Sequence, residues 1–263
     1  MAGPIKVPVV SQQALGGQVY HLVLAAPEVA AAAVPGQFLH LRVGEGHDPL
    51  LRRPLSICEA DREEGTVALL YQVRGRGTAW LAGRRAGERL DVLGPLGRGF
   101  PAPPRDGPCF LVGGGLGVAP LLFLATALHR GGIPVVFLAG AESAAGLYRL
   151  STLTARGIAP AVATVDGSAG YRGPVTELLA RYLRPQAAAA LYACGPREML
   201  REVARLGARA ETPTFVSLEE VMACGTGLCR GCAVPVRGGR TRYERVCAEG
   251  PVFPAERVAW DAL

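Results

Sequence analysis

The sequence has almost no lysine. Lys6 is the only one, so the net charge of +6 comes from arginines that are scattered or stand in short pairs such as Arg52–Arg53 and Arg84–Arg85. Proteins that bind nucleic acids gather their basic residues on one face or in a recognisable motif, and no such motif is found here. We therefore expect no nucleic-acid partner, and codon preference is the simplest explanation of the arginine content.

Long hydrophobic runs are also missing. The most apolar stretch, GVAPLLFLATAL (117–128), is too short to cross a bilayer and contains Gly and Pro. The first ten residues, MAGPIKVPVV, hold one Lys with no apolar core behind it, so no secretion signal is found. We expect a cytoplasmic protein without membrane contact, in a compartment where thiols stay reduced.

The chain divides into three zones that differ in their pattern of apolar and polar residues. Residues 1–102 alternate apolar and polar side chains in short runs such as TVALLYQV (66–73), which predicts antiparallel strands and a small β-barrel. The proline-rich stretch 100–108 is expected to link this zone to the next. Residues 103–210 alternate fully apolar runs with helical stretches, which indicates a parallel sheet covered on both faces. Residues 211–263 have little periodicity and form the third predicted domain, organised around something bound.

Four of the seven cysteines lie in this last zone with the spacing C-x4-C-x2-C-x14-C; they are Cys224, Cys229, Cys232 and Cys247. Structural zinc sites usually combine two C-x2-C pairs, whereas three cysteines in one loop and a distant fourth are typical of plant-type 2Fe–2S centres. Glycines at 225, 227 and 231 would let the backbone turn N–H groups toward sulfur. The pattern favours a 2Fe–2S cluster, with zinc or an inert loop as alternatives. Cys58 and Cys109 stand in apolar runs and are expected to be small buried residues.

The first zone carries the motifs R-P-L-S (53–56), Y-Q-V (71–73), G-x-G-T (75–78) and G-P-L-G (94–97). A Gly-Thr pair at the start of a helix can donate backbone N–H groups to a phosphate, and the guanidinium group of a nearby Arg can bind the same phosphate through two N–H groups. In this order, the motifs resemble the FAD domain of the ferredoxin–NADP reductase superfamily. The resemblance implies that Arg53 binds the FAD pyrophosphate and that Ser56 lies beside flavin N5 as a catalytic residue. The flavin-binding residues that it implies are Arg53, Pro54, Leu55, Ser56, Leu70, Tyr71, Gln72, Gly77 and Thr78.

The second zone carries a glycine-rich turn, G-L-G-V-A-P (115–120), after an apolar run, and the motif C-G-P-x-x-M (194–199) after another. A turn between strand and helix suits a dinucleotide phosphate, although Pro120 replaces the third glycine of the usual fingerprint. Both motifs resemble the nicotinamide domain of the same superfamily. The resemblance implies nicotinamide binding by Gly115, Gly117, Pro120, Cys194, Gly195 and Pro196, with Cys194 also catalytic. NAD rather than NADP follows from the resemblance alone.

A flavin barrel, a nicotinamide domain and a compact cluster segment ending in RVCAEGPVFPAERV (245–258) resemble, over the full length, the electron-transfer subunits of NAD-dependent (class 1B) dihydroorotate dehydrogenases. This resemblance implies an FMN-containing catalytic partner subunit, with two copies of each chain. Electrons would pass from FMN through the 2Fe–2S cluster and FAD to NAD+ in pyrimidine synthesis, and the chain alone would not oxidise dihydroorotate. The cluster loop, including LCRG (228–231), would lie at the subunit contact.

Two other functions stay open at this stage. The chain could be a related diaphorase subunit, of the NADH-dependent ferredoxin–NADP transhydrogenase or sulfhydrogenase gamma type, that serves another iron–sulfur partner. The transhydrogenase subunits carry Asp at one cluster position, whereas this chain has four cysteines. The third hypothesis is an adaptor that has lost its flavin and is stabilised by zinc.

Overall fold

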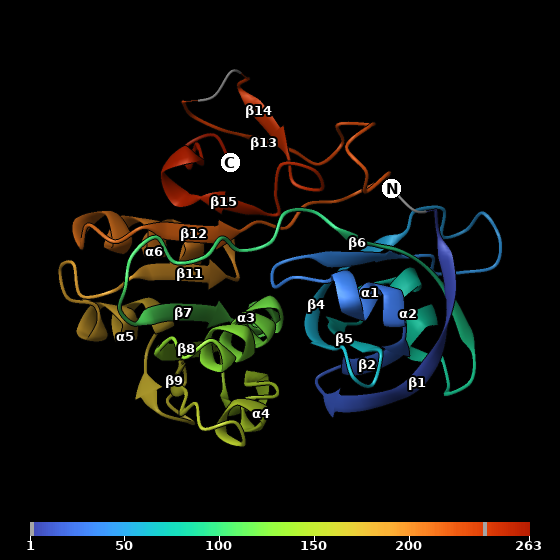
Figure 1. Ribbon diagram of the computed structural model, residues 1–263, viewed down its shortest axis with the longest axis horizontal. Helices are drawn as coiled ribbons and strands as arrows, with labels where there is room; N and C mark the ends of the chain where they lie inside the picture. The colour runs from blue at the N-terminus through green and yellow to red at the C-terminus, as the bar shows by residue number, and fades with distance from the viewer. Residues whose placement is uncertain (1–2, 239–240) are drawn as a thin grey trace.

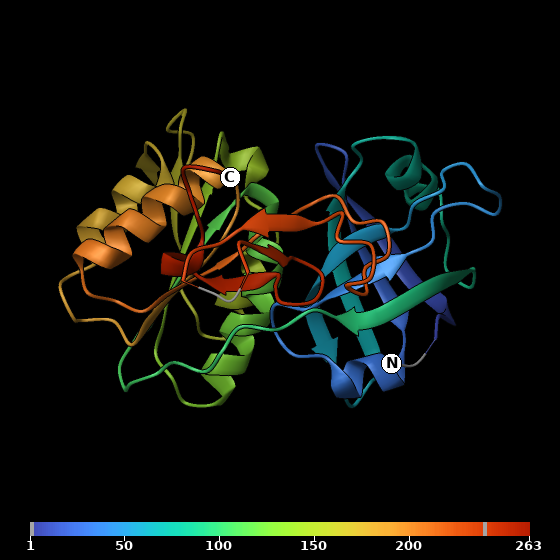
Figure 2. The same ribbon diagram turned by 90° about the horizontal axis from the view of Figure 1, so that it is seen from above.

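The computed structural model describes residues 3–238 and 241–263. A β-barrel and a second body built on a parallel sheet lie side by side, and the C-terminal segment lies over the region where they meet (Figures 1 and 2). This arrangement brings the chain's three predicted zones into mutual contact.

The N-terminal body is a closed antiparallel barrel with the strand order β1-β2-β5-β4-β3-β6. Its strands are β1 (Ile5–Gly16), β2 (Val19–Ala25), β3 (Phe38–Leu41), β4 (Arg53–Asp61), β5 (Thr66–Gln72) and β6 (Arg89–Leu96). Two short helices accompany them, α1 (Pro27–Ala32) and α2 (Arg76–Ala82). Alternate side chains fill the interior, where Leu22, Leu39 and Leu69 are completely buried. The alternating pattern therefore predicted this body correctly.

The second body is a seven-stranded sheet with the order β10-β9-β8-β7-β11-β12-β15. Its parallel strands are β7 (Cys109–Gly114), β8 (Val135–Ala141), β9 (Ala161–Thr164), β10 (Tyr171–Arg172), β11 (Ala190–Cys194) and β12 (Thr214–Ser217). The helices are α3 (Val118–Arg130), α4 (Ser151–Thr154), α5 (Val175–Tyr182) and α6 (Arg197–Arg209), with short 3-10 turns η1 (Gly115–Gly117), η2 (Ala144–Gly146) and η3 (Ala255–Arg257). Helices α5 and α6 contribute to one apolar core and α3 to another, as a sheet buried on both faces requires.

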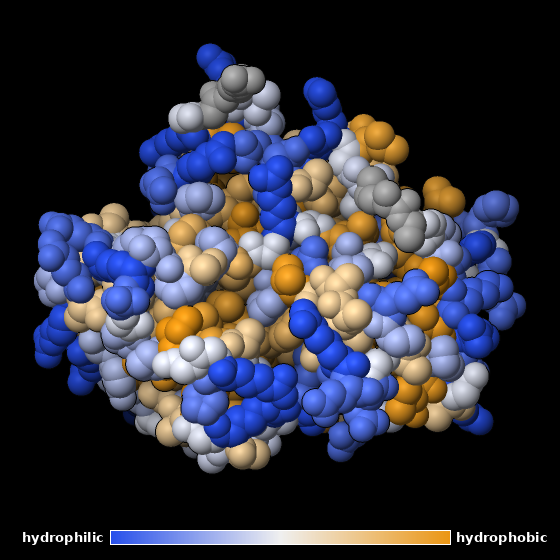
Figure 3. Space-filling view, in the orientation of Figure 1, coloured by the Kyte–Doolittle hydropathy of each residue, from blue (hydrophilic) through white to orange (hydrophobic). Residues whose placement is uncertain are grey.

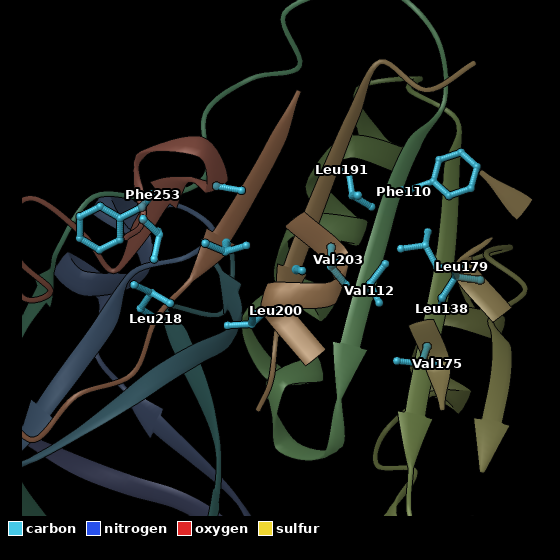
Figure 4. Close-up of a cluster of buried hydrophobic side chains, with 14 of the residues drawn as sticks. Phe110, Val112, Leu138, Val175, Leu179, Leu191, Leu200, Val203, Leu218 and Phe253 are labelled. Carbon is cyan, nitrogen blue, oxygen red and sulfur yellow. The ribbon is translucent and has the colours of Figure 1, made fainter. Parts of the chain in front are cut away.

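The C-terminal segment is joined to the sheet at both of its ends. It begins with β12, and β15 (Val252–Pro254) returns antiparallel to β12 at the sheet edge. Between them, β13 (Ala233–Pro235) and β14 (Tyr243–Arg245) form a separate two-stranded sheet. Figure 4 shows Leu218 and Phe253 near Leu200 of α6, in the same apolar cluster that contains Cys232 and Cys247. The segment thus shares its core with the parallel sheet.

Residues 100–108, with their prolines, connect β6 to β7 without a helix or strand. In the described residues, the helices are too short and too polar for any of them to traverse a bilayer. Hydrophilic side chains are spread over the face seen in Figure 3, with smaller apolar areas between them.

Candidate functional site: a cleft between the barrel and the sheet, and a cysteine loop beside it

A cleft of 870 Å³ lies between the two bodies. Its lining comes from three parts of the chain: the barrel, mainly strands β4 and β5; the turns after β7 and β11; and the C-terminal segment, mainly residues 217–222. A cleft of this size accommodates an organic cofactor. The three predicted zones therefore meet at one cavity.

The barrel wall of the cleft contains nearly all the residues that the sequence assigned to flavin. Those that line it are Arg53, Pro54, Leu55, Ser56, Leu70, Tyr71, Gln72 and Thr78. Gly77 does not line the cleft but lies directly behind Arg53, where a Cβ atom would come within 2.9 Å of the guanidinium Nε and Nη2. The R-P-L-S and G-x-G-T motifs are thus in contact, and glycine at 77 leaves the room that Arg53 needs.

Arg53, the first residue of β4, and Arg52, the residue before it, have different surroundings. Arg52 donates to the carbonyl oxygens of His40 and Asp91, both at 3.2 Å, and forms an ion pair of 2.7 Å with the Asp91 carboxylate. Arg53 donates only to nearby carbonyl oxygens and forms no ion pair with any described residue. Arg52 therefore ties the barrel strands together, whereas Arg53 presents an uncompensated positive charge in the cleft.

Two other predicted flavin residues are engaged in local structure. The Thr78 hydroxyl accepts hydrogen bonds from the backbone N–H groups of Arg74 (2.9 Å) and Gly75 (3.3 Å), so it orders the loop that opens α2. Tyr71 is 2 % exposed, and its hydroxyl donates to Gln12 Oε1 at 2.8 Å. Burial, followed by the neighbouring Tyr20, raises the Tyr71 pKa. The phenol therefore stays neutral and serves mainly to shape the wall.

On the sheet side, some predicted nicotinamide residues reach the cleft and others do not. Gly117, Gly195 and Pro196 line it, whereas Gly115, Pro120 and Cys194 lie outside its lining. A Cβ atom at Gly117 would come within 2.2 Å of the Cys194 carbonyl oxygen, so the two motifs are packed tightly together.

The Cys194 thiol itself is buried at the end of β11. Burial, followed by the charge of Glu219, raises its pKa, although a hydrogen bond from the Ser217 hydroxyl works in the opposite direction. The thiol is therefore protonated at neutral pH. Ser217 does line the cleft, so it is the hydroxyl partner of Cys194 that faces the cavity. The catalytic role of Cys194 stays a prediction.

Sequence reasoning missed the third wall of the cleft, which includes Ser217, Glu219 and Met222. Enclosure by the cleft raises the Glu219 pKa, and the positive charge of Arg74 across the cavity opposes that shift. The only signal in the sequence was the position of S-L-E-E-V-M between an apolar run and the first cysteine of the loop. This wall leads directly into the cysteine loop, because Met222 lines the cleft and Cys224 follows two residues later.

The four cysteines of the C-terminal segment come together as two pairs. The backbone N–H of Cys229 donates to Cys224 Sγ, and that of Cys247 donates to Cys232 Sγ, both at 3.5 Å. Cys232 and Cys247 are buried, whereas Cys229 is exposed and Cys224 is half-buried. One pair is therefore anchored in the core and the other lies toward the surface.

Backbone N–H groups surround these sulfurs, as the glycine-rich loop predicts. Gly227 donates to Cys247 Sγ at 3.2 Å, Gly231 to Cys229 Sγ at 3.5 Å, and Thr226 and Cys229 to Cys224 Sγ at 3.4 and 3.5 Å. Burial opposes ionisation of Cys224, but the hydrogen bonds from Cys229 and Thr226 outweigh it and lower the Cys224 pKa to about 6. The loop thus stabilises negative charge on the Cys224 sulfur, whereas burial, followed by the neighbouring Cys232, raises the Cys247 pKa to about 12.

In the described part of the chain, no three His, Cys, Asp or Glu side chains converge closely enough to bind one metal ion. A tetrahedral zinc site brings all four thiolates around one point, whereas a 2Fe–2S centre takes them two at each iron. The observed pairs therefore fit the diiron arrangement better than the zinc alternative.

Arg245 holds the loop from the other side. Its guanidinium donates to the Gly227 carbonyl oxygen, and its Nε donates to Glu249 Oε2 at 2.8 Å. A side-chain hydrogen bond from Arg245 lowers the Glu249 pKa to about 2, so this carboxylate stays charged at neutral and mildly acidic pH.

His40, a residue of β3 that the sequence did not single out, lies against the cysteine loop. It is fully buried, and a Cβ atom at Gly225 would come within 2.4 Å of its Nδ1. Burial, followed by the charge of Arg52, lowers its pKa to about 4. Backbone groups of Met222 and Cys224 face the ring, but neither imidazole nitrogen has a hydrogen-bond partner of good geometry among the described residues.

Comparison with known proteins identifies the family. Residues 219–259 match the model of the iron–sulfur cluster binding domain of dihydroorotate dehydrogenase B. The chain is 43% identical over 261 residues to the dihydroorotate dehydrogenase B (NAD(+)) electron transfer subunit of Geobacillus thermodenitrificans, covering 98% of this chain and 99% of the relative. It is 41% identical to the subunit of the same name from Desulforamulus reducens, covering 92% and 93%. The chain belongs to this family of electron transfer subunits.

Solved structures agree with this assignment. An NADH-dependent reduced ferredoxin–NADP oxidoreductase, described for flavin-based electron bifurcation, superposes with a TM-score of 0.87 at 31% identity, covering 99% of this chain and 92% of that one. A ferredoxin NADP+ reductase from Neisseria gonorrhoeae with bound FAD and NADP shares the fold, with a TM-score of 0.68 at 18% identity, covering 80% of this chain and 92% of that one. The predicted architecture of an antiparallel barrel, a parallel-sheet domain and a C-terminal iron–sulfur segment is confirmed.

Proposed function

We propose that this chain is the electron-transfer subunit of a dihydroorotate dehydrogenase, in which it binds FAD, a 2Fe–2S cluster and NAD(H) and acts in de novo pyrimidine synthesis. One observation carries the proposal. The lining of a single cleft runs from the predicted flavin strands, past the predicted nicotinamide turns, to a segment that ends at the first cysteine of the loop. Sites for three redox groups are therefore adjacent within one chain.

The barrel wall is suited to hold FAD. Arg53 supplies an uncompensated positive charge for the pyrophosphate, and Gly77 leaves space for that side chain. Ser56 lines the cleft from β4 and would hydrogen-bond the ring edge, while Leu70 and Tyr71 from β5 exclude water from one face. When bound, FAD exchanges electron pairs with NAD(H) and single electrons with an iron–sulfur cluster.

The sheet side of the cleft is suited to bind the nicotinamide. Gly117 and Gly195 expose backbone at the cleft without side chains, so a flat ring can approach closely. Ser217 lines the same region and donates to the buried Cys194 thiol, which keeps that thiol in place. NAD is favoured over NADP by the names of the relatives.

The two thiol pairs, Cys224 with Cys229 and Cys232 with Cys247, would each hold one iron of a 2Fe–2S cluster. The N–H groups of Thr226 and Cys229 favour the thiolate form of Cys224 that iron requires.

We further propose that the partner is an FMN-containing catalytic subunit, with two copies of each chain in the cytoplasm. Apart from the cleft, the described cavity lined by His21 and Cys58 has a volume of only 10 Å³, too small for an organic substrate such as dihydroorotate. Leu228, next to Cys229, is 84% exposed, and Val221 is 77% exposed. The exposed apolar side chain of Leu228, beside the exposed Cys229, suits a contact through which electrons leave the chain.

The visible spectrum of the chain, purified without oxygen, tests the proposal. We expect flavin bands with added cluster absorbance, partly bleached by NADH, and about two irons per chain. A colourless protein with one zinc per chain would contradict it.

The variant Cys229→Ser tests the order of the redox groups. We expect loss of the cluster and of electron transfer from dihydroorotate to NAD+ in the complex, with reduction of FAD by NADH largely kept. Cys58→Ser, at a buried thiol of the barrel outside the loop, is the control and should retain the cluster. Loss of both half-reactions from a folded Cys229→Ser protein would overturn the order.

A related diaphorase function is the second candidate, supported by the superposition on the ferredoxin–NADP oxidoreductase. Mixing the purified chain with each type of partner separates the two. The proposed function requires NAD+ reduction that depends on dihydroorotate.

A further inference from the structure

His40 is in contact with both proposed redox sites. It lies on β3 and pairs in register with Pro54 of β4, inside the R-P-L-S motif. Two residues earlier on β3, Phe38 pairs with Ser56, lines the cleft, and meets the imidazole edge-on with 6.5 Å between the ring centroids. His40 does not line the cleft itself, but one of its sides packs against Phe38, which does.

The other side of His40 is covered by the cysteine loop. The imidazole is so close to Gly225 that a Cβ atom there would come within 2.4 Å of Nδ1, and Gly225 has a φ of +70°, which side chains rarely adopt. Backbone groups of Met222 and Cys224 also face the ring. His40 thus occupies the space between the strand that carries Pro54 and the loop that carries the first cysteine.

Both nitrogen atoms of the His40 imidazole are available for hydrogen bonds at this position. The imidazole is completely buried, and neither nitrogen has a hydrogen-bond partner of good geometry among the described residues. A neutral imidazole carries one N–H donor and one acceptor, and leaving such a group unpaired in the interior is unfavourable. Buried N–H donors near thiolate ligands are a main means by which proteins adjust iron–sulfur centres.

We propose that His40 is a positioning residue that holds the cysteine loop against the flavin-binding strand and directs an N–H group toward the iron–sulfur site. It thereby sets the potential of the cluster and the rate at which electrons pass between cluster and FAD. This inference rests on the proposed function and goes beyond it, because it assigns the coupling of the two sites to one side chain of the barrel.

The test compares His40→Leu and His40→Gln with His21→Leu. His21 is a matched control, because it is also a buried histidine of the barrel with an unpartnered Nε2 and a pKa lowered to about 4, but it lines the 10 Å³ cavity next to Cys58 and Arg149. Leucine replaces the ring with an apolar group, whereas glutamine keeps an N–H donor. The readouts are the electron paramagnetic resonance spectrum of the reduced cluster, its midpoint potential, and the rates of FAD reduction by NADH and of cluster reduction by reduced FAD.

We expect His40→Leu to change the resonance spectrum and the potential, and to slow FAD-to-cluster transfer by about 10- to 100-fold, the usual effect of removing a group that supports metal ligands. FAD content and FAD reduction by NADH should remain at the wild-type level. His40→Gln should recover part of the transfer rate, and His21→Leu should leave spectrum and potential unchanged.

The inference is overturned if His40→Leu has the resonance spectrum, potential and transfer rate of the unmodified chain, or if His21→Leu alters them equally. If His40→Leu fails to fold, wild-type values for His40→Gln, Ala and Asn together would overturn it. A wild-type chain without cluster absorbance would instead refute the proposed function, so the two failures are distinguishable.

Discussion

The barrel and the cysteine loop are stabilised by different means. The barrel closes through a complete ring of antiparallel backbone pairings around its own apolar interior. The described residues between β12 and β15, 218–238 and 241–251, contain only the short strand pair β13 and β14. Several of their N–H groups donate to sulfur instead of to carbonyl oxygen. In the cysteine loop, sulfur atoms therefore take the place of carbonyl oxygens as acceptors for the backbone, and β12 and β15 fix the two ends of the loop.

The largest expected effect comes from removing one buried thiol. In Cys232→Ser the hydroxyl cannot supply a thiolate, so we expect complete loss of the cluster and rapid proteolysis confined to residues 219–250. The barrel and the parallel sheet should stay resistant, and FAD should stay bound. Limited proteolysis with mass spectrometry and iron analysis measures both outcomes, with Cys109→Ser, at a buried thiol of β7, as the control. Proteolysis that spread through the barrel would show that the two regions are not independent.

Arg52 and Arg53, at the start of β4, are expected to differ in their effects on stability and on FAD binding. We expect Arg53→Ala to weaken FAD binding by about 10- to 100-fold with little change in melting temperature, since charged hydrogen bonds contribute about 1.5–3 kcal/mol. Arg52→Ala should instead lower the free energy of unfolding by about 1–3 kcal/mol, because the Asp91 carboxylate and two carbonyl oxygens lose their donor. Flavin titration and denaturant unfolding measure the two effects. Equal losses of FAD in both variants would contradict the distinction.

Gly117→Ala tests the tight contact between the turn after β7 and the end of β11. The added Cβ would come within 2.2 Å of the Cys194 carbonyl oxygen, so backbone must move, and we expect a loss of about 1–3 kcal/mol in the stability of the parallel-sheet domain. NADH binding should weaken as well. Gly46→Ala is the control, because a Cβ there meets no atom within 4 Å. Calorimetry and NADH titration check the result, and identical values for the two variants would be inconsistent with this packing.

The smallest effect is expected at the ion pair beside the loop. Glu249→Gln removes the carboxylate that holds Arg245 near Gly227. We expect the free energy of unfolding to fall by about 0.5–1 kcal/mol and iron to be released faster to a chelator. Glu202→Gln breaks a comparable but more exposed pair with Arg205 on α6 and should leave iron release unchanged. The measurement is the rate at which a chelator removes iron from each variant. Equal rates in the two variants would mean that Arg245 does not support the loop.

The two regions also differ in how far the sequence predicted them. The barrel strands and the parallel strands follow from their alternating or fully apolar runs, and cysteine spacing located the loop. The role of β15 could not be predicted, because a three-residue strand has no measurable period and its pairing with β12 depends on tertiary contacts. The predicted flavin residues largely share one wall, whereas Ser217, Glu219 and His40 were missed because each acquires its neighbours only when distant segments meet.

The pairing of β12 with β15 has a consequence for how the protein is matured. The register Ser217↔Val252 and Val216↔Phe253 clamps both ends of the cysteine loop through main-chain bonds that involve no sulfur. Iron and sulfide can accordingly enter or leave by rearrangement of the intervening residues alone, with the sheet border remaining intact. We therefore expect the sheet border to form without the cluster, so that the polypeptide can fold before its inorganic centre is assembled.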